Sequence, residues 1–143
     1  MQSRRFSAWT DSVPAARGFV VDALDQVPPG MCETAALLVS ELATNVVRHS
    51  GADTFTVQVE FFPADGRLWI GVSDTGEGQP LLRTPPATDE NGRGLRLVSL
   101  MADRWGAHRR RETHEKTVWF ELLGRTSYPA AATDDPTTTG MRS

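Results

Sequence analysis

The chain has 143 residues, 39% of them hydrophobic and 23% charged, and its formal net charge at pH 7 is -3. This size and composition predict one soluble globular domain with a substantial core, and they leave too few residues for a second full domain. The weak negative charge gives no overall electrostatic reason to expect binding to nucleic acid or to an anionic membrane surface.

The sequence also favours one compartment. No apolar run approaches the roughly 20 residues needed to cross a bilayer, and the N-terminus has no apolar signal-peptide core. The single cysteine, Cys32, cannot form an internal disulfide. We therefore expect a cytoplasmic protein that binds neither nucleic acid directly nor a membrane.

The first fifty residues predict a short strand followed by two helices. Polar and apolar residues alternate weakly over 4–9, and an amphipathic helical pattern begins near Pro14. That pattern stops at the PPG sequence of 28–30, because proline and glycine interrupt helices. A second helix is predicted over 31–49, ending before the Ser-Gly pair at 50–51.

The middle of the chain predicts a β-hairpin. Residues 54–62 alternate with period two, and 68–72 resume the alternation after a turn sequence at 63–66. Both segments can place one apolar face against a core. The second strand runs directly into Asp74, which places a carboxylate where the backbone leaves the sheet.

The rest of the chain predicts a loop, a helix, two strands and a tail. Residues 76–92 contain three glycines and three prolines with few apolar anchors, so we expect a mobile loop. A helical pattern follows, and strands are predicted near 104–110 and 116–123. Residues 124–143 have too little apolar area to fold alone, so we expect a disordered tail after a folded domain of 1–123.

The second helix carries a polar stripe beside its apolar one. At about 100° per residue, Glu41, Asn45 and Arg48 fall within an arc of about 60°. A carboxylate and a carboxamide four residues apart project side by side. Mg²⁺ prefers oxygen ligands and commonly completes its shell with water and substrate phosphates, which suits an amide oxygen at Asn45. Pairs of this kind are also frequent on ordinary helix surfaces. Whether Glu41 and Asn45 form part of a binding site therefore depends on the two glycine loops downstream.

The first glycine loop, DTGEG at 74–78, suits a flat aromatic base. Gly76 and Gly78 permit positive φ angles and a close approach of the backbone to a ring. Asp74 can accept hydrogen bonds from an exocyclic amino group such as that of adenine. Alone, the sequence also fits an ordinary turn.

The second glycine loop suits a phosphate group. Gly92 and Gly94 immediately precede a helix predicted from Leu95, where free backbone amides and the helix dipole favour an anion. Arg93 could add a bidentate contact. This loop, too, is a weak signal by itself.

Taken in order, these motifs resemble those of the GHKL ATPases and kinases, which share the Bergerat ATP-binding fold. SELATNVVRHS at 40–50 resembles the family's N box, DTGEG its first glycine box and GRGLRLV at 92–98 its second. The resemblance covers about 5–123, and within the family it points to the small bacterial anti-sigma factor serine kinases. The combination of motifs is specific, although each motif is not.

The resemblance implies an α+β fold. It would be a two-layer sandwich in which a mixed, mostly antiparallel sheet is covered on one face by about three helices. ATP and Mg²⁺ are the implied cofactors. Glu41 would be the general base on a protein hydroxyl, and Asn45 would be the magnesium ligand. The remaining nucleotide contacts implied by the resemblance are Asp74, Gly76 and Gly78 on the base side, and Gly92, Arg93, Gly94 and Leu95 at the phosphates.

One implied contact departs from the family pattern. Many relatives have a threonine near the start of the last strand that helps to bind adenine through water. Here the first residue of the corresponding pair is Lys116, and Thr117 follows it. We assign the nucleotide contact to Thr117, although strand alternation puts it on the face opposite Val118 and Phe120.

The resemblance implies a protein serine or threonine kinase that transfers the γ-phosphate of ATP to an anti-sigma factor antagonist and captures a sigma factor. A homodimer formed through the stretch 6–9 is also expected. An alternative is a regulatory module that binds nucleotide without transferring phosphate. A detached histidine-kinase catalytic domain is less favoured, because no upstream helix presents a phosphoacceptor histidine.

Overall fold

The structure is a computed structural model that describes residues 1–76 and 90–124, with only the backbone described at 90–94. Its five strands form one sheet in the order β1-β2-β3-β5-β4. The strands are β1 Gln2–Ser7, β2 Thr54–Phe62, β3 Arg67–Asp74, β4 Arg104–Arg109 and β5 Lys116–Leu123. The helices are α1 Ser12–Ala23, α2 Pro29–Asn45 and α3 Glu90–Met101, and the π-helix η1 Val46–Ser50 directly continues α2.

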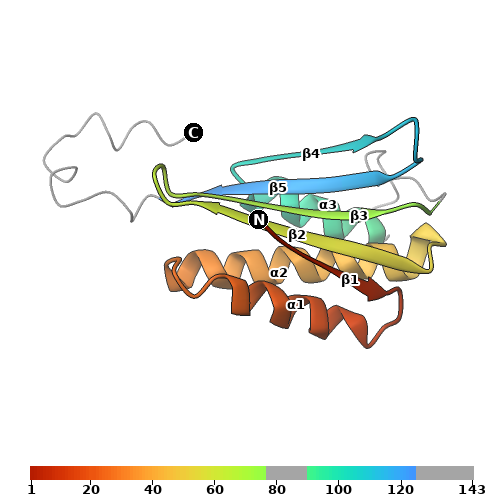
Figure 1. Ribbon diagram of the computed structural model, residues 1–143, viewed down its shortest axis with the longest axis horizontal. Helices are drawn as coiled ribbons and strands as arrows, with labels where there is room; N and C mark the ends of the chain where they lie inside the picture. Colours follow the sequence, from red (N-terminus) through yellow and green to blue (C-terminus); the bar gives the residue numbers. More distant parts are fainter. Residues whose placement is uncertain (77–89, 125–143) are drawn as a thin grey trace, which may run out of the picture.

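The fold is a two-layer α+β sandwich, as predicted. The three α-helices lie together on one side of the sheet (Figure 1). All four strand pairings among the described residues are antiparallel, so no parallel pair of the expected mixed sheet is present there. The strands β1 and β4 form the two edges of this sheet.

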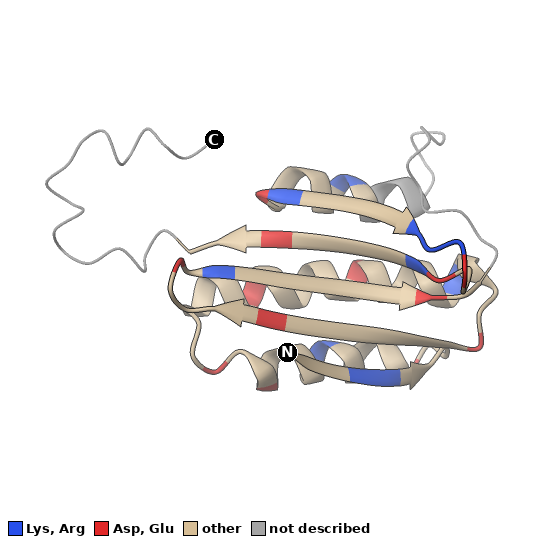
Figure 2. Ribbon diagram, turned by 45° about the horizontal axis from the view of Figure 1, so that its top comes forward, with Lys and Arg blue, Asp and Glu red and all other residues tan. Residues whose placement is uncertain are grey.

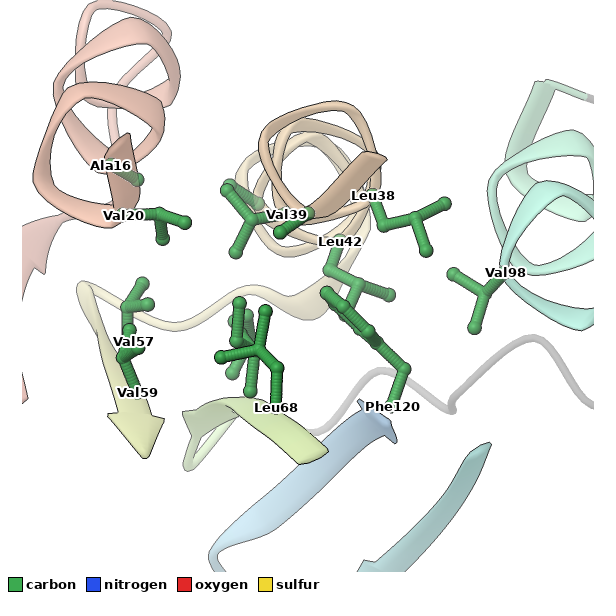
Figure 3. Packing of buried hydrophobic residues seen from close by; sticks show 14 of the residues in the cluster. Ala16, Val20, Leu38, Val39, Leu42, Val57, Val59, Leu68, Val98 and Phe120 are labelled. Carbon is green, nitrogen blue, oxygen red and sulfur yellow. The ribbon is translucent and has the colours of Figure 1, made fainter. Parts of the chain in front are cut away.

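The core lies between α2 and the middle of the sheet. Figure 3 shows Leu42 of α2 directed at Phe120 of β5, while Leu38 points toward Val98 of α3. On the other side of α2, Val39 faces Val20 of α1. All six side chains are at most 2% exposed, so α2 is held on three sides by apolar contacts.

The predicted hairpin is confirmed. The strand β2 has the expected bounds, and Phe55, Val57 and Val59 on its alternating positions are buried. Leu68 and Ile70 of β3 bury the corresponding face of the next strand. Period-two burial follows because only one face of the sheet meets the helices.

The end of α2 differs from the uniform helix predicted over 31–49. The α-helix stops at Asn45, and the chain continues as a π-helix to Ser50 before Gly51 adopts a left-handed φ of 79°. A π turn widens the helix, so the residues in it no longer follow a rotation of 100° per residue. The predicted arc therefore holds for Glu41 and Asn45 but cannot be extended to Arg48.

The start of α3 is a second difference. The helix was predicted from Leu95 with its glycines just before it, but it begins at Glu90 and contains Gly92 and Gly94. A glycine inside a helix costs about 1 kcal/mol relative to alanine, which burial of Leu95 and Val98 further along the helix can offset. Of the predicted mobile loop and tail, 77–89 and 125–143 lie outside the described residues.

The face of the sheet opposite the helices carries two half-buried tryptophans, Trp69 and Trp119. A Cβ at Gly71 would meet the ring of Trp69, and a Cβ at Gly106 would meet the ring of Trp119. Each ring therefore lies over a glycine backbone on its own or the neighbouring strand. Figure 2 shows this face of the sheet in front of the helices, with both basic and acidic residues in the turn between β4 and β5.

Candidate functional site

A pocket opens where η1, the end of α2 and the start of the described part of α3 meet the ends of β3 and β5. Most of its exposed wall is apolar, and its polar lining residues are Asn45, His49, Ser50, Asp74 and Lys116. The complete lining is Leu42, Asn45, Val46, His49, Ser50, Val72, Asp74, Leu95, Lys116 and Val118. An apolar cleft with a few convergent polar groups is the usual form of a small-molecule site.

The carboxylate of Asp74 is a nearly buried part of the pocket lining. Asp74 is the last residue of β3, and its side chain is only 2% exposed. Its Oδ1 accepts a 2.7 Å hydrogen bond from the Gly76 amide. No described residue donates a hydrogen bond to its Oδ2. The pocket thus holds a positioned acceptor, and the hydrogen bond from an exocyclic amino group that the sequence suggested for Asp74 stays a prediction.

Gly76 is required here because two backbone segments touch. A Cβ at this position would collide with the carbonyl oxygen of Ser50 at the end of η1. Among the described glycines, positive φ angles occur at Gly51 and Gly66 and not at Gly76. The positive φ predicted for Gly76 is therefore wrong, and its contact with the Ser50 backbone was not predicted. The close approach of the Gly76 backbone to an aromatic ring stays a prediction.

Asn45 and Glu41 lie one helical turn apart near the end of α2. Asn45 lines the pocket with Asp74, although 29 residues of sequence separate them. Glu41 is half-buried and lies outside the lining, and no described residue forms a hydrogen bond or ion pair with its carboxylate. The pair therefore presents an amide inside the pocket and a carboxylate one turn away from it.

Thr117 lies on the wrong face of the sheet for the contact predicted for it. Its hydroxyl is 2.7 Å from that of Ser73, and this buried pair lies on the face away from the helices. Strand alternation instead directs Lys116 to the helix side, with Val118 and Phe120. Lys116 is therefore the polar β5 residue that lines the pocket, and no role was predicted for it.

Lys116 is an unusual lining residue because its ammonium group is buried. Its side chain is 6% exposed, and its Nζ lies 3.8 Å from Oδ1 of Asp74. Burial lowers the pKa of Lys116, since desolvation penalises the charged form; Asp74 opposes this shift and Arg109 adds to it. The phase of β5 was the signal in the sequence, since Lys116 shares the parity of the buried Phe120.

The predicted phosphate-binding residues are only partly described. Gly78 lies outside the described residues, and so does the side chain of Arg93. Gly92 and Gly94 lie in the first turns of α3. Leu95 is 4% exposed and contributes an apolar wall to the pocket, so only its backbone could serve a phosphate.

The residues present fit a nucleotide and its metal ion. The apolar walls suit a planar base, and Asn45 offers the hard oxygen ligand that Mg²⁺ prefers. The described residues contain no group of three His, Cys, Asp or Glu side chains able to hold a metal. Mg²⁺ bound through substrate phosphates does not need such a group.

In the described part of the chain, no helix is long and apolar enough to span a membrane.

The sequence matches one protein-family model and one curated protein. A family model described as Histidine kinase-like ATPase domain matches residues 6–122. Among curated proteins, Uncharacterized protein SCO4941 of Streptomyces coelicolor is 40% identical over 74 residues, which cover 50% of this chain and 70% of that protein.

Two solved structures share the fold. The blue-light activated histidine kinase of Erythrobacter litoralis EL346 has a TM-score of 0.53 and 22% identity, covering 78% of this chain and 42% of that one. The structure of the RsbU and RsbW domains of Rv1364c from Mycobacterium tuberculosis has a TM-score of 0.54 and 13% identity. The match covers 86% of this chain and 32% of that one. The chain thus spans less than half of either protein.

Proposed function

The chain belongs to the histidine kinase-like ATPase domain family, and on this premise we propose that it binds ATP with Mg²⁺ and phosphorylates a serine or threonine of a regulatory partner protein. The observation that carries the proposal is the meeting of Asn45 and Asp74 in one pocket. These side chains come from different layers of the fold, and each has the chemistry that one part of the nucleotide needs.

The base would lie between the apolar walls of the pocket with its amino group toward Asp74. Oδ2 of that carboxylate has no donor among the described residues, while Oδ1 is held by the Gly76 amide. Leu42 of α2 and Val118 of β5 contribute apolar lining from the two layers of the fold, and we propose that they contact the ring. Burial of the base and one directed hydrogen bond together supply affinity and orientation.

The metal and the reacting phosphate would lie toward the α2 side of the pocket. Bound ATP supplies the phosphoryl group, and Mg²⁺ neutralises the charge that develops during transfer. Asn45 would ligate the metal through its amide oxygen. Glu41, one turn away, would accept the proton of the partner's hydroxyl group. The oxygen of that hydroxyl would form a bond to the γ-phosphorus while the bond between the γ-phosphorus and ADP breaks.

The partner is proposed to be an anti-sigma factor antagonist, with a sigma factor as a second ligand. The support is the motif resemblance together with the fold shared with a Mycobacterium tuberculosis structure that contains an RsbW domain. Phosphoryl transfer depends mainly on positioning and charge stabilisation, so a domain of this size is sufficient for it.

The test separates binding from transfer with one variant and a matched control. Glu41→Gln removes the proposed base, whereas Glu33→Gln makes the same change at an exposed position of α2. We expect both variants to bind Mg·ATP about as well as the wild type in calorimetry. We expect Glu41→Gln alone to lower phosphorylation of purified candidate antagonists by about 100-fold or more, measured by mass spectrometry of phosphoserine.

Three results would change this assignment. Unchanged transfer by Glu41→Gln would remove Glu41 from its role as base. Binding of Mg·ATP without phosphorylation of any candidate would favour a nucleotide-dependent binding module. Absence of Mg·ATP binding by the wild-type protein would overturn the proposal as a whole.

A further inference from the structure

The pocket contains the only lysine of the chain. Lys116 is the sole lysine among 15 Lys and Arg residues, and it lies directly opposite Asp74 in the register of β3 and β5. Both side chains are nearly excluded from solvent, at 6% and 2% exposure. Lysine is rarely buried without a partner, because removing its charge from water is costly.

The positions of the two groups are set by the backbone. The antiparallel pairing of Asp74 with Lys116 places both side chains on the helix side of the sheet. Asp74 is further held by the Gly76 amide, and Gly76 itself touches the backbone at Ser50. An acceptor and a donor are therefore presented side by side in the pocket lining, 3.8 Å apart.

This pairing matches the hydrogen-bonding edge of adenine. Adenine presents an amino donor next to a ring-nitrogen acceptor, N1. A carboxylate accepts only and an ammonium donates only, so the amino group must face Asp74 and N1 must face Lys116. Guanine in the same orientation would place its O6 acceptor against the carboxylate, which is also an acceptor. Its N1–H donor would face the ammonium, which is also a donor.

We propose that Lys116 donates a hydrogen bond directly to N1 of the adenine ring and thereby determines the base specificity of the site. This inference rests on the proposed nucleotide binding and adds to it the residue that reads the base beside Asp74. A charged donor to a neutral acceptor forms a stronger hydrogen bond than a neutral pair does. Thr117 is not available for this contact, because its hydroxyl pairs with Ser73 on the other face.

The test replaces one ring atom of the ligand. In 1-deaza-ATP a C–H group stands in place of N1, so the acceptor is lost while the amino group and phosphates remain. We expect wild-type protein to bind 1-deaza-ATP about tenfold or more weakly than ATP, in line with loss of a hydrogen bond to a charged group. Calorimetry with the full chain measures both dissociation constants.

The matching protein variant is Lys116→Met, which keeps the length of the side chain and removes the donor. Its ratio of the two dissociation constants should fall to about one, while Arg104→Met should keep the wild-type ratio. Arg104 is a suitable control because its charge is on the other face of the sheet, with a side chain that is 68% exposed.

The outcomes distinguish this inference from the function on which it rests. If wild-type protein binds ATP but binds 1-deaza-ATP equally well, or prefers GTP, the role of Lys116 is overturned while nucleotide binding stands. If it binds no nucleotide, both proposals fail. The wild-type comparison suffices even if Lys116→Met does not fold.

A second readout uses the uniqueness of this lysine. Labelling with ¹⁵N-lysine gives one side-chain Nζ signal, which belongs to Lys116. Saturating ATP should shift this signal, and 1-deaza-ATP should shift it less. Equal shifts with the two ligands would contradict a direct contact with N1.

Discussion

The two faces of the sheet each carry a buried carboxylate, and the two are stabilised in different ways. On the helix side, Asp74 pairs with Lys116, whose ammonium is itself buried. On the other side, Glu121 bonds Arg67 at 2.9 Å and lies 3.4 Å from Arg104, and these cations remain 30% and 68% exposed. Solvent thus hydrates the arginines that pair with Glu121 but hardly reaches Asp74 and Lys116.

This difference indicates which carboxylate serves a ligand. A cation that keeps much of its hydration loses little free energy when it pairs with a carboxylate. The ion pairs of Glu121 with Arg67 and Arg104 therefore carry a small desolvation cost on the sheet face away from the helices. A pair with both members buried must overcome two desolvation costs and is seldom retained for stability alone. The Asp74–Lys116 pair is therefore better explained by what it can bind than by what it contributes to folding.

The largest expected effect comes from Asp74→Asn. We expect ATP affinity to fall by about 100-fold, because the acceptor for the base is lost. Stability should fall by about 3 kcal/mol, because the Lys116 ammonium stays buried without its carboxylate. Urea denaturation should show part of this loss restored in Asp74→Asn/Lys116→Met. Equal stability of the single and double variants would mean that the two side chains are not coupled.

Gly76→Ala should have an intermediate effect on the same side of the sheet. The added Cβ must displace the Ser50 backbone, so we expect a loss of about 2 kcal/mol in stability and weaker ATP binding. Gly18→Ala in α1 is the control, since a Cβ there meets no heavy atom within 4 Å. That change should leave stability equal or about 0.5 kcal/mol higher. A neutral effect of Gly76→Ala in denaturation curves would argue against the close contact.

The smallest effect is expected for Glu121→Gln on the opposite face. Its carboxylate interacts with partly hydrated arginines, so Tm should fall by only about 3 °C in thermal unfolding. The dissociation constant for ATP should not change, because Glu121 does not line the pocket. A loss of affinity as large as that of Asp74→Asn would show that the two faces are not independent.

The sequence predicted the parts of the fold that depend on local patterning. The bounds of β2 followed from strict alternation, and Asp74 was correctly placed at the end of β3. Asn45 was expected to share a site with Asp74, and the two side chains do line one pocket. These features depend on periodicity and on the order of the motifs, which a single sequence contains.

Other features depend on tertiary contacts and could not be predicted in this way. The π-helix at Val46–Ser50 changes the rotation of the last turn without a sequence signal that marks it. The start of α3 at Glu90 overrides the helix-breaking tendency of two glycines. Alternation along β5 already placed Lys116 on the side of Phe120, but its position directly opposite Asp74 appears only once β3 and β5 are paired.

The tryptophans that lie over Gly71 and Gly106 have an optical consequence. Their indoles lie on the side of the sheet away from the helices, fixed against backbone and outside the pocket lining, whereas Trp9 is 68% exposed. Their emission should therefore shift to longer wavelength when the sheet comes apart, and should change little when a small molecule fills the pocket. The protein thus carries an intrinsic fluorescent probe of unfolding that needs no added dye.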